Sequence, residues 1–238
     1  MAPPRASRPL IVILTGAGIS AESGLRTFRA ADGLWENHRV EDVATPEAFV
    51  RDPDLVQRFY NERRRQLGAV APNAAHHALA RLEREWPGEL LLVTQNVDDL
   101  HDRAGSANLI HMHGELLKAR CLACGKVSPW EDDITPESAC PSCRRLGRLR
   151  PHIVWFGEMP LELDRIGDAL ERCSHFAAIG TSGHVYPAAG FVSMVPSTAQ
   201  TVELNLDASR VSSAFHVCRQ GRATELVPAW VDGLLSSC

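Results

Sequence analysis

Four short, largely apolar runs divide the chain and predict the strands of a buried sheet. Successive residues of a strand point to opposite faces, so a continuous apolar run is typical of a strand that is covered on both sides in a parallel sheet. The predicted strands span residues 10–15, 90–94, 175–179 and 201–206. Between them, apolar residues recur at helical spacing in segments 54–67, 74–86, 163–173 and 224–235. Strands that alternate with helices favour the α/β class, with a doubly wound parallel sheet.

Two stretches interrupt this alternation and predict a second, smaller lobe. Residues 31–71 combine loop-like sequence with an arginine-rich helix, and residues 116–150 contain two pairs of cysteines with little apolar periodicity. We therefore assign residues 10–30, 72–115 and 151–238 to the sheet domain, the two stretches to the small lobe, and residues 1–9 to a loose tail. The 238 residues suit one large domain that carries such an insert.

The composition argues against fibrous, disordered and membrane-spanning classes. It is 45% apolar and 23% charged, close to that of an average globular protein. The longest aliphatic run near the N-terminus, residues 10–14, is far shorter than the roughly 18 residues that cross a bilayer and shorter than a signal-peptide core. A formal net charge of -4 argues against a general nucleic-acid-binding surface. We expect a cytoplasmic protein with no membrane partner.

Four of the seven cysteines form two Cys-x-x-Cys pairs that predict a metal site. Cys121 and Cys124 are separated from Cys140 and Cys143 by 15 residues, a spacing that lets two tight turns direct four thiolates at one ion. We interpret the site as structural zinc, with an iron centre of the same geometry as the lesser alternative. The arginines of segment 144–150 either offset the thiolate charge or contact nucleic acid, and the lack of interleaved aromatic residues favours the first.

A glycine-rich turn directly after the first strand is the main candidate for a nucleotide site. Gly16, Gly18 and Ala21 match the G-x-G-x-x-A pattern, in which the glycines allow a tight turn and close approach of a pyrophosphate, and the next helix offers free N–H groups. A small-residue turn that only packs a helix on the sheet is the alternative. An ordinary dehydrogenase would also carry an acidic residue at the end of a second strand about 20 residues on. Glu36 and Glu41 lie in loop-like sequence instead, which weakens an oxidoreductase function.

Polar residues after the second strand and two nearby histidines are further candidates. Gln95, Asn96 and Asp98 follow the strand at the edge of the sheet where ligands bind, although Asp98 could equally cap a helix. His111 and His113 share one face of an extended segment, so they could hold a metal or provide a base. The glycine that follows His113 would let a ligand approach the backbone there.

Taken in order, these motifs resemble those of the sirtuins, and most closely the bacterial CobB type. The resemblance covers residues 10–235. The matching motifs are Gly16-Ala17-Gly18-Ile19-Ser20, Ser23-Gly24, Phe28-Arg29, Thr94-Gln95-Asn96-Val97-Asp98, His113-Gly114, the two cysteine pairs, Val154-Trp155-Phe156-Gly157-Glu158, Gly180-Thr181-Ser182 and Asn205. Two positions depart from the family pattern, since Glu115 replaces a common Asn and Arg26 replaces a common Pro in the cofactor loop.

The resemblance implies an NAD-dependent protein-lysine deacylase with a Rossmann-like NAD-binding domain and a small helical, zinc-binding lobe. An acylated-lysine protein would lie between the lobes as an extended strand that pairs with Val154, Trp155, Phe156, Gly157 and Glu158. NAD would be bound by Gly16, Ala17, Gly18, Ser20, Ala21, Glu22, Thr27, Phe28, Arg29, Trp35, Gln95, Asn96, Val97, Asp98, Gly180, Thr181, Ser182, Asn205, Leu206, Asp207 and Ala223. One structural zinc ion would be held by Cys121, Cys124, Cys140 and Cys143, remote from the chemistry.

The mechanism implied by the resemblance is acyl transfer to ADP-ribose rather than hydride transfer. The acyl oxygen attacks C1′ of the NAD ribose and expels nicotinamide, which gives an alkylimidate. His113 then acts as general base on the ribose hydroxyls, and water releases lysine and O-acyl-ADP-ribose. Tyr60 and Arg63 lie three residues apart on one predicted helix face and match the Tyr-x-x-Arg signature of sirtuins that remove succinyl and malonyl groups. We therefore expect acetyl and succinyl or malonyl substrates.

Two other functions stay open on the residues alone. An NAD-linked oxidoreductase would use the same glycine-rich turn to transfer hydride. A zinc-ribbon module would bind nucleic acid through segment 144–150 with steep salt dependence. The missing acidic residue counts against the first and the missing aromatic platform against the second, while an ADP-ribosyltransferase side activity is compatible with the same motifs.

Overall fold

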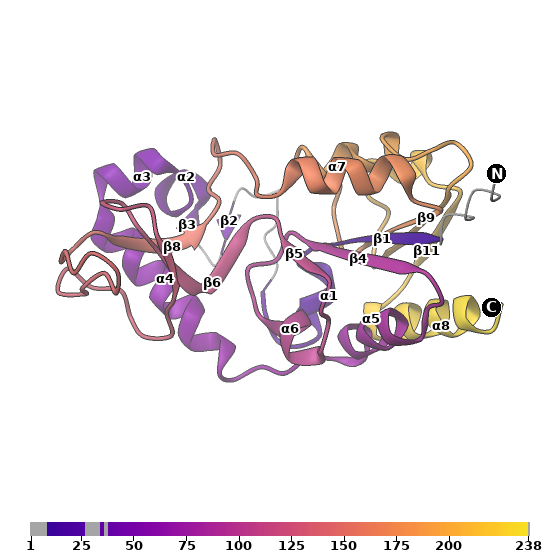
Figure 1. Cartoon of the computed structure of the whole chain (residues 1–238), viewed down its shortest axis with the longest axis horizontal. Helices are drawn as coiled ribbons and strands as arrows, with labels where there is room; N and C mark the ends of the chain where they lie inside the picture. Colours follow the sequence, from indigo (N-terminus) through magenta and orange to yellow (C-terminus); the bar gives the residue numbers. More distant parts are fainter. Residues whose placement is uncertain (1–8, 27–33, 36–37, 238) are drawn as a thin grey trace, which may run out of the picture.

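The computed structural model describes residues 9–26, 34–35 and 38–237, with only the backbone of residues 34–35. Figure 1 shows two lobes side by side along the long axis of the molecule. The larger lobe contains a six-stranded sheet with helices on both faces, and the smaller lobe combines short and long helices with a three-stranded sheet. The expected α/β class, with a Rossmann-like parallel sheet and a smaller lobe, is confirmed. Within the described residues, no helix is long and apolar enough to span a membrane.

The six-stranded sheet has the order β11-β10-β9-β1-β4-β5, and every neighbouring pair is parallel. Its strands are β1 (Leu10–Thr15), β4 (Glu89–Thr94), β5 (Leu109–His111), β9 (His175–Ile179), β10 (Gln200–Asn205) and β11 (Val217–Gln220). The four strands expected from apolar runs are present to within one residue at each end. The edge strands β5 and β11 give no such signal, because β5 has three residues and all four residues of β11 are exposed.

Helices cover both faces of this sheet (Figure 1). α7 (Leu163–Arg172) lies on one face, and α5 (Ala74–Glu85) and α8 (Ala223–Leu235) lie together on the other. Side chains of β1 alternate between the two resulting cores, with Leu14 in the core that contains α7 and Ile13 in the core that contains α5 and α8. Both faces of β1 are buried, which explains why its sequence is a continuous apolar run.

Two of the four long helices begin at a side-chain cap. Asp52 accepts a hydrogen bond from the N–H of Leu55 at 2.9 Å, and a proline opens the first turn of α4 (Pro53–Leu67). Asn73 caps α5 in the same way and donates its own N–H to Nδ1 of His76 at 3.3 Å. All four helices expected from periodicity are present, and each begins and ends within one residue of its predicted bounds. The short helices are α1 (Gly18–Ala21) and α6 (Leu100–Ala104), with 3-10 turns at Ala188–Ser193 and Ser212–Ala214.

The small lobe is built on α4 and on an antiparallel sheet of order β7-β6-β8. Its other elements are β2 (Leu34–Trp35), β3 (His38–Arg39), α2 (Val40–Val43), α3 (Pro46–Arg51), β6 (Gly114–Cys121), β7 (Val127–Pro129) and β8 (Leu149–Ile153). Phe59 and Tyr60 of α4 pack with Leu116 of β6 and with Trp155 in one buried core. The pairing of β6 with β8 runs from Gly114 to Ile153, beyond the boundaries at 116 and 150 expected from composition. The difference arises because both strands continue across the junction of the lobes without a change in composition.

Candidate active site between the two lobes

A cavity of about 1020 Å³ is lined by both lobes. Its wall combines the loops after β1, β4, β9 and β10 with residues of α4 and of the segment after β8, so it lies at the carboxyl ends of the parallel strands. Most of the expected site residues line it: Gly16, Ala17, Gly18, Ser20, Ala21, Glu22, Tyr60, Arg63, Gln95, Asn96, Val97, Asp98, His113, Val154, Trp155, Phe156, Gly157, Glu158, Gly180, Thr181, Ser182, Asn205, Leu206, Asp207 and Ala223. Thr27, Phe28 and Arg29 lie outside the described residues, as does the side chain of Trp35.

The glycine-rich turn packs against the loop that follows β9. The N–H of Gly18 donates to the carbonyl of Gly180 at 2.8 Å, and a Cβ at Gly18 would lie 2.7 Å from Cα of Gly180. The glycines are therefore required by the contact between two loops. The helix α1 that follows is a single turn, in which the amides of Ile19 and Ser20 donate to the carbonyls of Gly16 and Ala17 at 3.2 Å, so these two N–H groups already have partners within the turn. This region lines the cavity chiefly as a close-packed backbone surface.

Ser20 is the centre of a buried polar network at the cavity wall. The amide of Asn96 donates to Oγ of Ser20 at 3.0 Å, and that Oγ donates to the carboxylate of Asp98 at 3.0 Å. The second carboxylate oxygen of Asp98 accepts the N–H of Leu100 at 3.1 Å. Asp98 therefore satisfies an amide in the first turn of α6, as the capping alternative expected, while its contact with a ligand stays a prediction. Burial raises the pKa of Asp98, while the bonds from Leu100 and Ser20 favour its charged form.

Two buried histidines support this network, and no motif marks them in the sequence. His76 of α5 lies 3.5 Å from Oγ of Ser20, and Nε2 of His101 lies 3.0 Å from Oγ1 of Thr15 at the end of β1. Their rings are 4.8 Å apart. Burial lowers the pKa of His76 to about 4 and also lowers the pKa of His101, so both rings are neutral near pH 7. The capping-box position of His76 at the start of α5 was the one local signal that could have indicated its inward orientation.

His113 is oriented for proton transfer. Its Nδ1 lies 3.1 Å from the carbonyl oxygen of Gln95. A carbonyl can only accept, so Nδ1 carries the hydrogen and Nε2 keeps a free lone pair. Burial lowers the pKa of His113, with the Gln95 carbonyl acting in the opposite direction. The neutral, basic form therefore predominates at neutral pH.

His111 does not act together with His113. Its Nε2 forms an ion pair with the carboxylate of Asp102 at 3.0 Å, and these bonds raise the pKa of His111 despite its burial. Across the described ranges, only the four cysteines bring three or more potential metal ligands together, so the two histidines are not part of a larger ligand cluster. The expected role of Gly114 is also corrected. Its φ is +82°, and a Cβ there would lie 2.0 Å from the carbonyl oxygen of His152, so the close approach is made by β8 rather than by a ligand.

Tyr60 and Arg63 of α4 both line the cavity. Tyr60 is fully buried, and its hydroxyl oxygen accepts the indole N–H of Trp155 at 2.9 Å. Arg63 is 8% exposed, and its guanidinium lies over the ring of Phe59, 4.9 Å from the ring centre. Burial raises the pKa of Tyr60 and lowers that of Arg63, where the nearby charge of Arg26 acts in the same direction. At neutral pH Tyr60 is therefore a protonated phenol and Arg63 a cation, and both line the cavity.

The segment 154–158 is held in place by its own contacts. The N–H of Val154 donates to the carbonyl of His113 at 2.9 Å, and the N–H of Phe156 donates to that of Ala44 at 2.9 Å. The carboxylate of Glu158 accepts two hydrogen bonds from Arg150, at 2.8 and 2.9 Å. Glu158 therefore stabilises the shape of the segment, and its carboxylate is not available as a simple partner for a bound peptide.

Also at the cavity wall, Asn205 joins the loops after β9 and β10. Its Oδ1 accepts the N–H of Thr181 and its Nδ2 donates to the carbonyl of the same residue, each at 2.9 Å. Glu22 accepts the N–H of Thr224 at 3.1 Å and thereby caps the first turn of α8. These two residues act first as connectors between loops. The lining also includes residues that no motif marks, namely Gln66, Pro160, His184, Val185, Tyr186 and Arg222.

The four cysteines of the small lobe converge on one point. Their sulfur atoms all lie within 4.8 Å of one another, and the Cys121–Cys143 and Cys124–Cys140 pairs are separated by 3.7 and 3.8 Å. Sulfurs bound about 2.3 Å from a tetrahedral zinc ion are about 3.8 Å apart, so donor set and spacing both fit structural zinc. The cluster is distinct from the residues that line the cavity.

One turn geometry is used twice to hold these cysteines. The first cysteine of each turn, Cys121 or Cys140, donates its N–H to the carbonyl five residues later, at 2.9 and 3.0 Å. The residue four positions on, Gly125 or Arg144, has a left-handed backbone with φ of 72° or 62°. Because each pair is arranged by its own local turn, the Cys-x-x-Cys spacing sufficed to predict the site.

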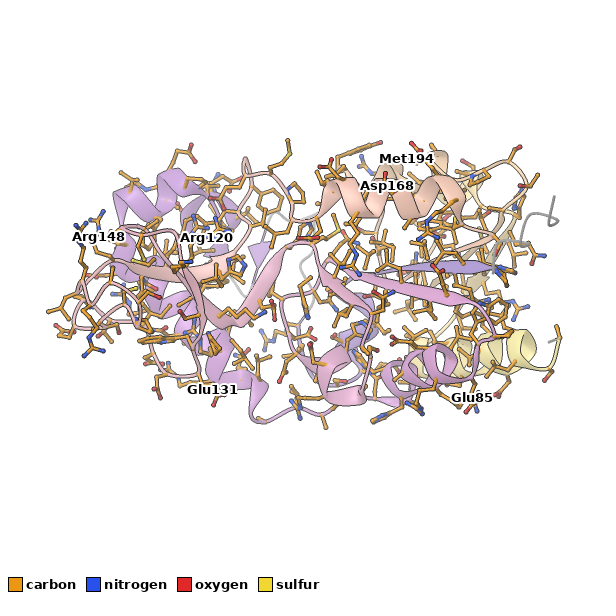
Figure 2. The ribbon with its side chains drawn as sticks, in the orientation of Figure 1. Glu85, Arg120, Glu131, Arg148, Asp168 and Met194 are labelled. Atoms are coloured by element: carbon orange, nitrogen blue, oxygen red, sulfur yellow. The ribbon has the colours of Figure 1, made fainter. Side chains whose placement is uncertain are left out.

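The arginines after the last cysteine do not form one continuous surface. Arg144, Arg145 and Arg148 are exposed, and Figure 2 shows Arg148 at the outer end of the small lobe. Arg150 is 5% exposed and its guanidinium is directed at Glu158. The segment therefore combines a solvated face near the cysteines with one inward, structural arginine.

Comparisons with known proteins agree with this architecture. Residues 16–187 match the model of the Sir2 family. A protein of Pasteurella multocida (strain Pm70) named NAD-dependent protein deacylase is 63% identical over 228 residues, which cover 94% of this chain and 97% of that protein. A Sir2 homologue solved with NAD is 40% identical with a TM-score of 0.87, covering 97% of this chain and 91% of the other. A Sir2 structure with a p53 peptide and NAD+ is 30% identical with a TM-score of 0.80, covering 95% and 93%. The match to the family model, the high identity and the shared fold together establish that this chain belongs to the Sir2 family.

Proposed function

We propose that this Sir2 protein is an NAD-dependent protein-lysine deacylase that removes acetyl and succinyl or malonyl groups. The observation that carries the proposal is a single cavity lined by a neutral, oriented His113, by the glycine-rich loop after β1 and by Tyr60 and Arg63. The name of the Pasteurella multocida relative and the NAD complex of the Sir2 homologue support the same activity.

The residues that line the cavity fit NAD. A volume of about 1020 Å³ is at the upper end of the range for small-molecule pockets, about 300–1,000 Å³, as a dinucleotide together with an acyl side chain requires. Residues 16–18 and 180–182 would contact the phosphates, Asn205 to Asp207 and Ala223 the adenosine, and Gln95 to Asp98 the nicotinamide. When bound, NAD supplies a ribose carbon that can lose nicotinamide and accept the acyl oxygen.

His113 would act as general base in this reaction. Its Nδ1–H is held by the Gln95 carbonyl, so Nε2 is the atom that would accept a proton from a ribose hydroxyl. The Ser20–Asn96–Asp98 network would fix the polar wall against which the nicotinamide amide binds. These groups need no reorganisation when the ligand arrives, because their hydrogen bonds already exist in the protein.

The phenol of Tyr60 and the guanidinium of Arg63 would select acyl groups that end in a carboxylate. A protonated phenol donates one hydrogen bond to the carboxylate, and the cation pairs with its charge in a site from which water is largely excluded. An acetyl group would fill the same space without these two contacts. We therefore assign succinyl and malonyl lysine as the substrates that use the pair, with acetyl lysine accepted as well.

The acylated protein would bind as an extended strand beside residues 154–158. The p53 peptide complex of a Sir2 protein supports a peptide partner of this kind. A cytoplasmic location would suit the chain, because a reducing compartment keeps four zinc-binding cysteines from forming disulfides. We propose no role in binding nucleic acid or membranes.

One experiment tests the activity and the acyl class together. The purified protein is incubated with NAD and with otherwise identical acetyl-, succinyl- and unmodified peptides, and the products are identified by mass. We expect free lysine, nicotinamide and O-acyl-ADP-ribose from both acyl peptides. Reduced nicotinamide without O-acyl-ADP-ribose would instead identify an oxidoreductase.

Variants of α4 test the acyl pair. Arg63→Met and Tyr60→Phe should each lower kcat/KM for the succinyl peptide about tenfold more than for the acetyl peptide, since each removes a hydrogen bond to a charged group. Arg58→Met on the exposed face of the same helix is the matched control and should change neither value. Equal losses on both peptides would refute the acyl-carboxylate role while leaving the deacylase activity intact.

A further inference from the structure

A chain of buried contacts links Glu158 to Tyr60 through Arg150 and Trp155. All four residues belong to the region where the segment after β8 meets α4, and Trp155 is 2% exposed. The chain joins the segment proposed to hold the substrate to the group proposed to select its acyl end. It therefore connects two residues, Tyr60 and Trp155, that are 95 positions apart in the sequence.

Arg150 and Glu158 clamp Trp155 from two sides. The guanidinium of Arg150 lies over the Trp155 ring, 3.4 Å from its centre, and also donates to the carbonyl of Ile153 at 2.6 Å. The carboxylate of Glu158, already paired with Arg150, accepts the backbone N–H of Trp155 at 2.9 Å. The ring and the backbone of Trp155 are both held by this charge pair, in which the Arg150 side chain is 7% exposed and the Glu158 side chain 27%. The indole therefore has a single orientation before any ligand binds.

The direction of the hydrogen bond between Trp155 and Tyr60 determines what the phenol can offer. An indole N–H can only donate, so the Tyr60 oxygen is the acceptor of the 2.9 Å bond. The hydroxyl hydrogen of Tyr60 is thus assigned to the donor role, and its direction is restricted by the bond that the oxygen already accepts. The geometry of the two rings, 6.2 Å apart and inclined at 37°, holds this arrangement.

We propose that Trp155 is a positioning residue for acyl selectivity, which acts by orienting the Tyr60 hydroxyl toward an acyl carboxylate. The inference rests on the proposed function of the Tyr60–Arg63 pair and deepens it. Trp155 need not touch the carboxylate, because its effect passes through the Tyr60 oxygen. Arg150 and Glu158 contribute by holding the indole in place.

A double-mutant cycle tests the proposal. kcat and KM are measured on matched succinyl and acetyl peptides for the wild type, Trp155→Phe, Tyr60→Phe and the double variant. We expect Trp155→Phe to lower the succinyl-to-acetyl ratio of kcat/KM about fivefold, which is the effect of losing one hydrogen bond of ordinary net strength. The change should appear as a higher KM for the succinyl peptide. In the Tyr60→Phe background, the same substitution should leave the ratio unchanged.

The cycle separates positioning from packing. Loss of ring volume at Trp155 lowers activity on both peptides and in both backgrounds, so it does not alter the ratio. Trp130→Phe is the matched control, because the Trp130 indole nitrogen is buried with no hydrogen-bond partner within the part of the chain that the structure describes. Its ratio should equal that of the wild type. If Trp155→Phe does not fold, Glu158→Gln weakens the same clamp and enters the same cycle.

The outcomes also distinguish this inference from the proposed function. A wild type that does not desuccinylate, or a Tyr60→Phe variant with an unchanged ratio, would overturn the acyl-carboxylate role itself. A different outcome is that the wild type and the Tyr60→Phe variant behave as proposed while the effect of Trp155→Phe persists in the Tyr60→Phe background. That result would overturn only the positioning role of Trp155.

Discussion

Gly114→Ala is the substitution for which the structure gives the clearest quantitative expectation. Gly114 follows the proposed base, His113, at the point where β6 begins to pair with β8. Its φ is +82°, and an added Cβ would lie 2.0 Å from the carbonyl oxygen of His152. Real Cβ contacts are essentially never shorter than 3.0 Å, so the two strands must separate by about 1 Å at this position.

Three costs add up to the expected loss of stability. The left-handed backbone costs an alanine about 1–2 kcal/mol. Separation of the strands weakens the 2.9 Å bond from the N–H of Val154 to the carbonyl of His113, worth about 1 kcal/mol, and leaves a poorly packed contact that costs about 1 kcal/mol more. The total is about 3–4 kcal/mol, which in a chain of this size lowers Tm by roughly 10 °C.

Gly105→Ala is the matched control for backbone strain. Gly105 has φ of +96°, but an added Cβ would meet nothing within 4 Å. Gly105→Ala should therefore incur only the first of the three costs, which lowers Tm by about 3–6 °C. Thermal unfolding followed by circular dichroism measures both variants, and deacylase kcat should fall in Gly114→Ala but not in Gly105→Ala. Equal losses of Tm in the two variants would refute the argument that β8 is what requires a glycine beside His113.

Three further predictions follow from the pKa shifts and the cysteine cluster. Since burial lowers the pKa of His113, kcat/KM should rise with pH with its midpoint below about pH 6.5, and a midpoint above pH 7 would contradict its assignment as the base. The pKa of His76 is about 4 in the folded state and about 6.5 in the unfolded state, so the unfolded state takes up the proton first as the pH falls. The free energy of unfolding should therefore decrease as the pH drops from about 6.5 to about 4. Urea titrations at several pH values should show a smaller decrease in His76→Asn. Cys140→Ser should reduce the zinc content measured by atomic emission and lower Tm by several degrees, whereas Cys218→Ser, at an exposed position on β11, should change neither.

Local sequence predicted the four buried strands and the four long helices, because burial of one or two faces requires apolar residues at regular spacing along the chain. The run at 10–15 became the fully buried centre of the sheet, and the cap residue Asn73 began α5 where the pattern required. The metal site was equally local, since each Cys-x-x-Cys pair is arranged by its own turn. The strands with no apolar record, β5 and β11, could not be found in this way because they lie at the sheet edges.

The roles of individual site residues depended on partners distant in sequence. Gly114 is required by His152, the carboxylate of Glu158 is directed at Arg150, and the hydroxyl of Tyr60 is oriented from 95 positions away by Trp155. His76 and His101 carry no motif, yet they meet behind Ser20. No pattern within a window of a few residues encodes such pairs.

The sequence by itself therefore determined four buried strands of the large sheet and four long helices, where four thiolates meet, and which residue types are available at the strand ends. Only the tertiary structure decided which of those residues line the cavity together, which nitrogen of His113 carries the hydrogen, and which polar groups bond to one another in the walls. The physical reason is that periodicity and turn chemistry act over a few residues, whereas orientation of a buried polar group is set by the hydrogen-bond partner that the whole fold brings to it.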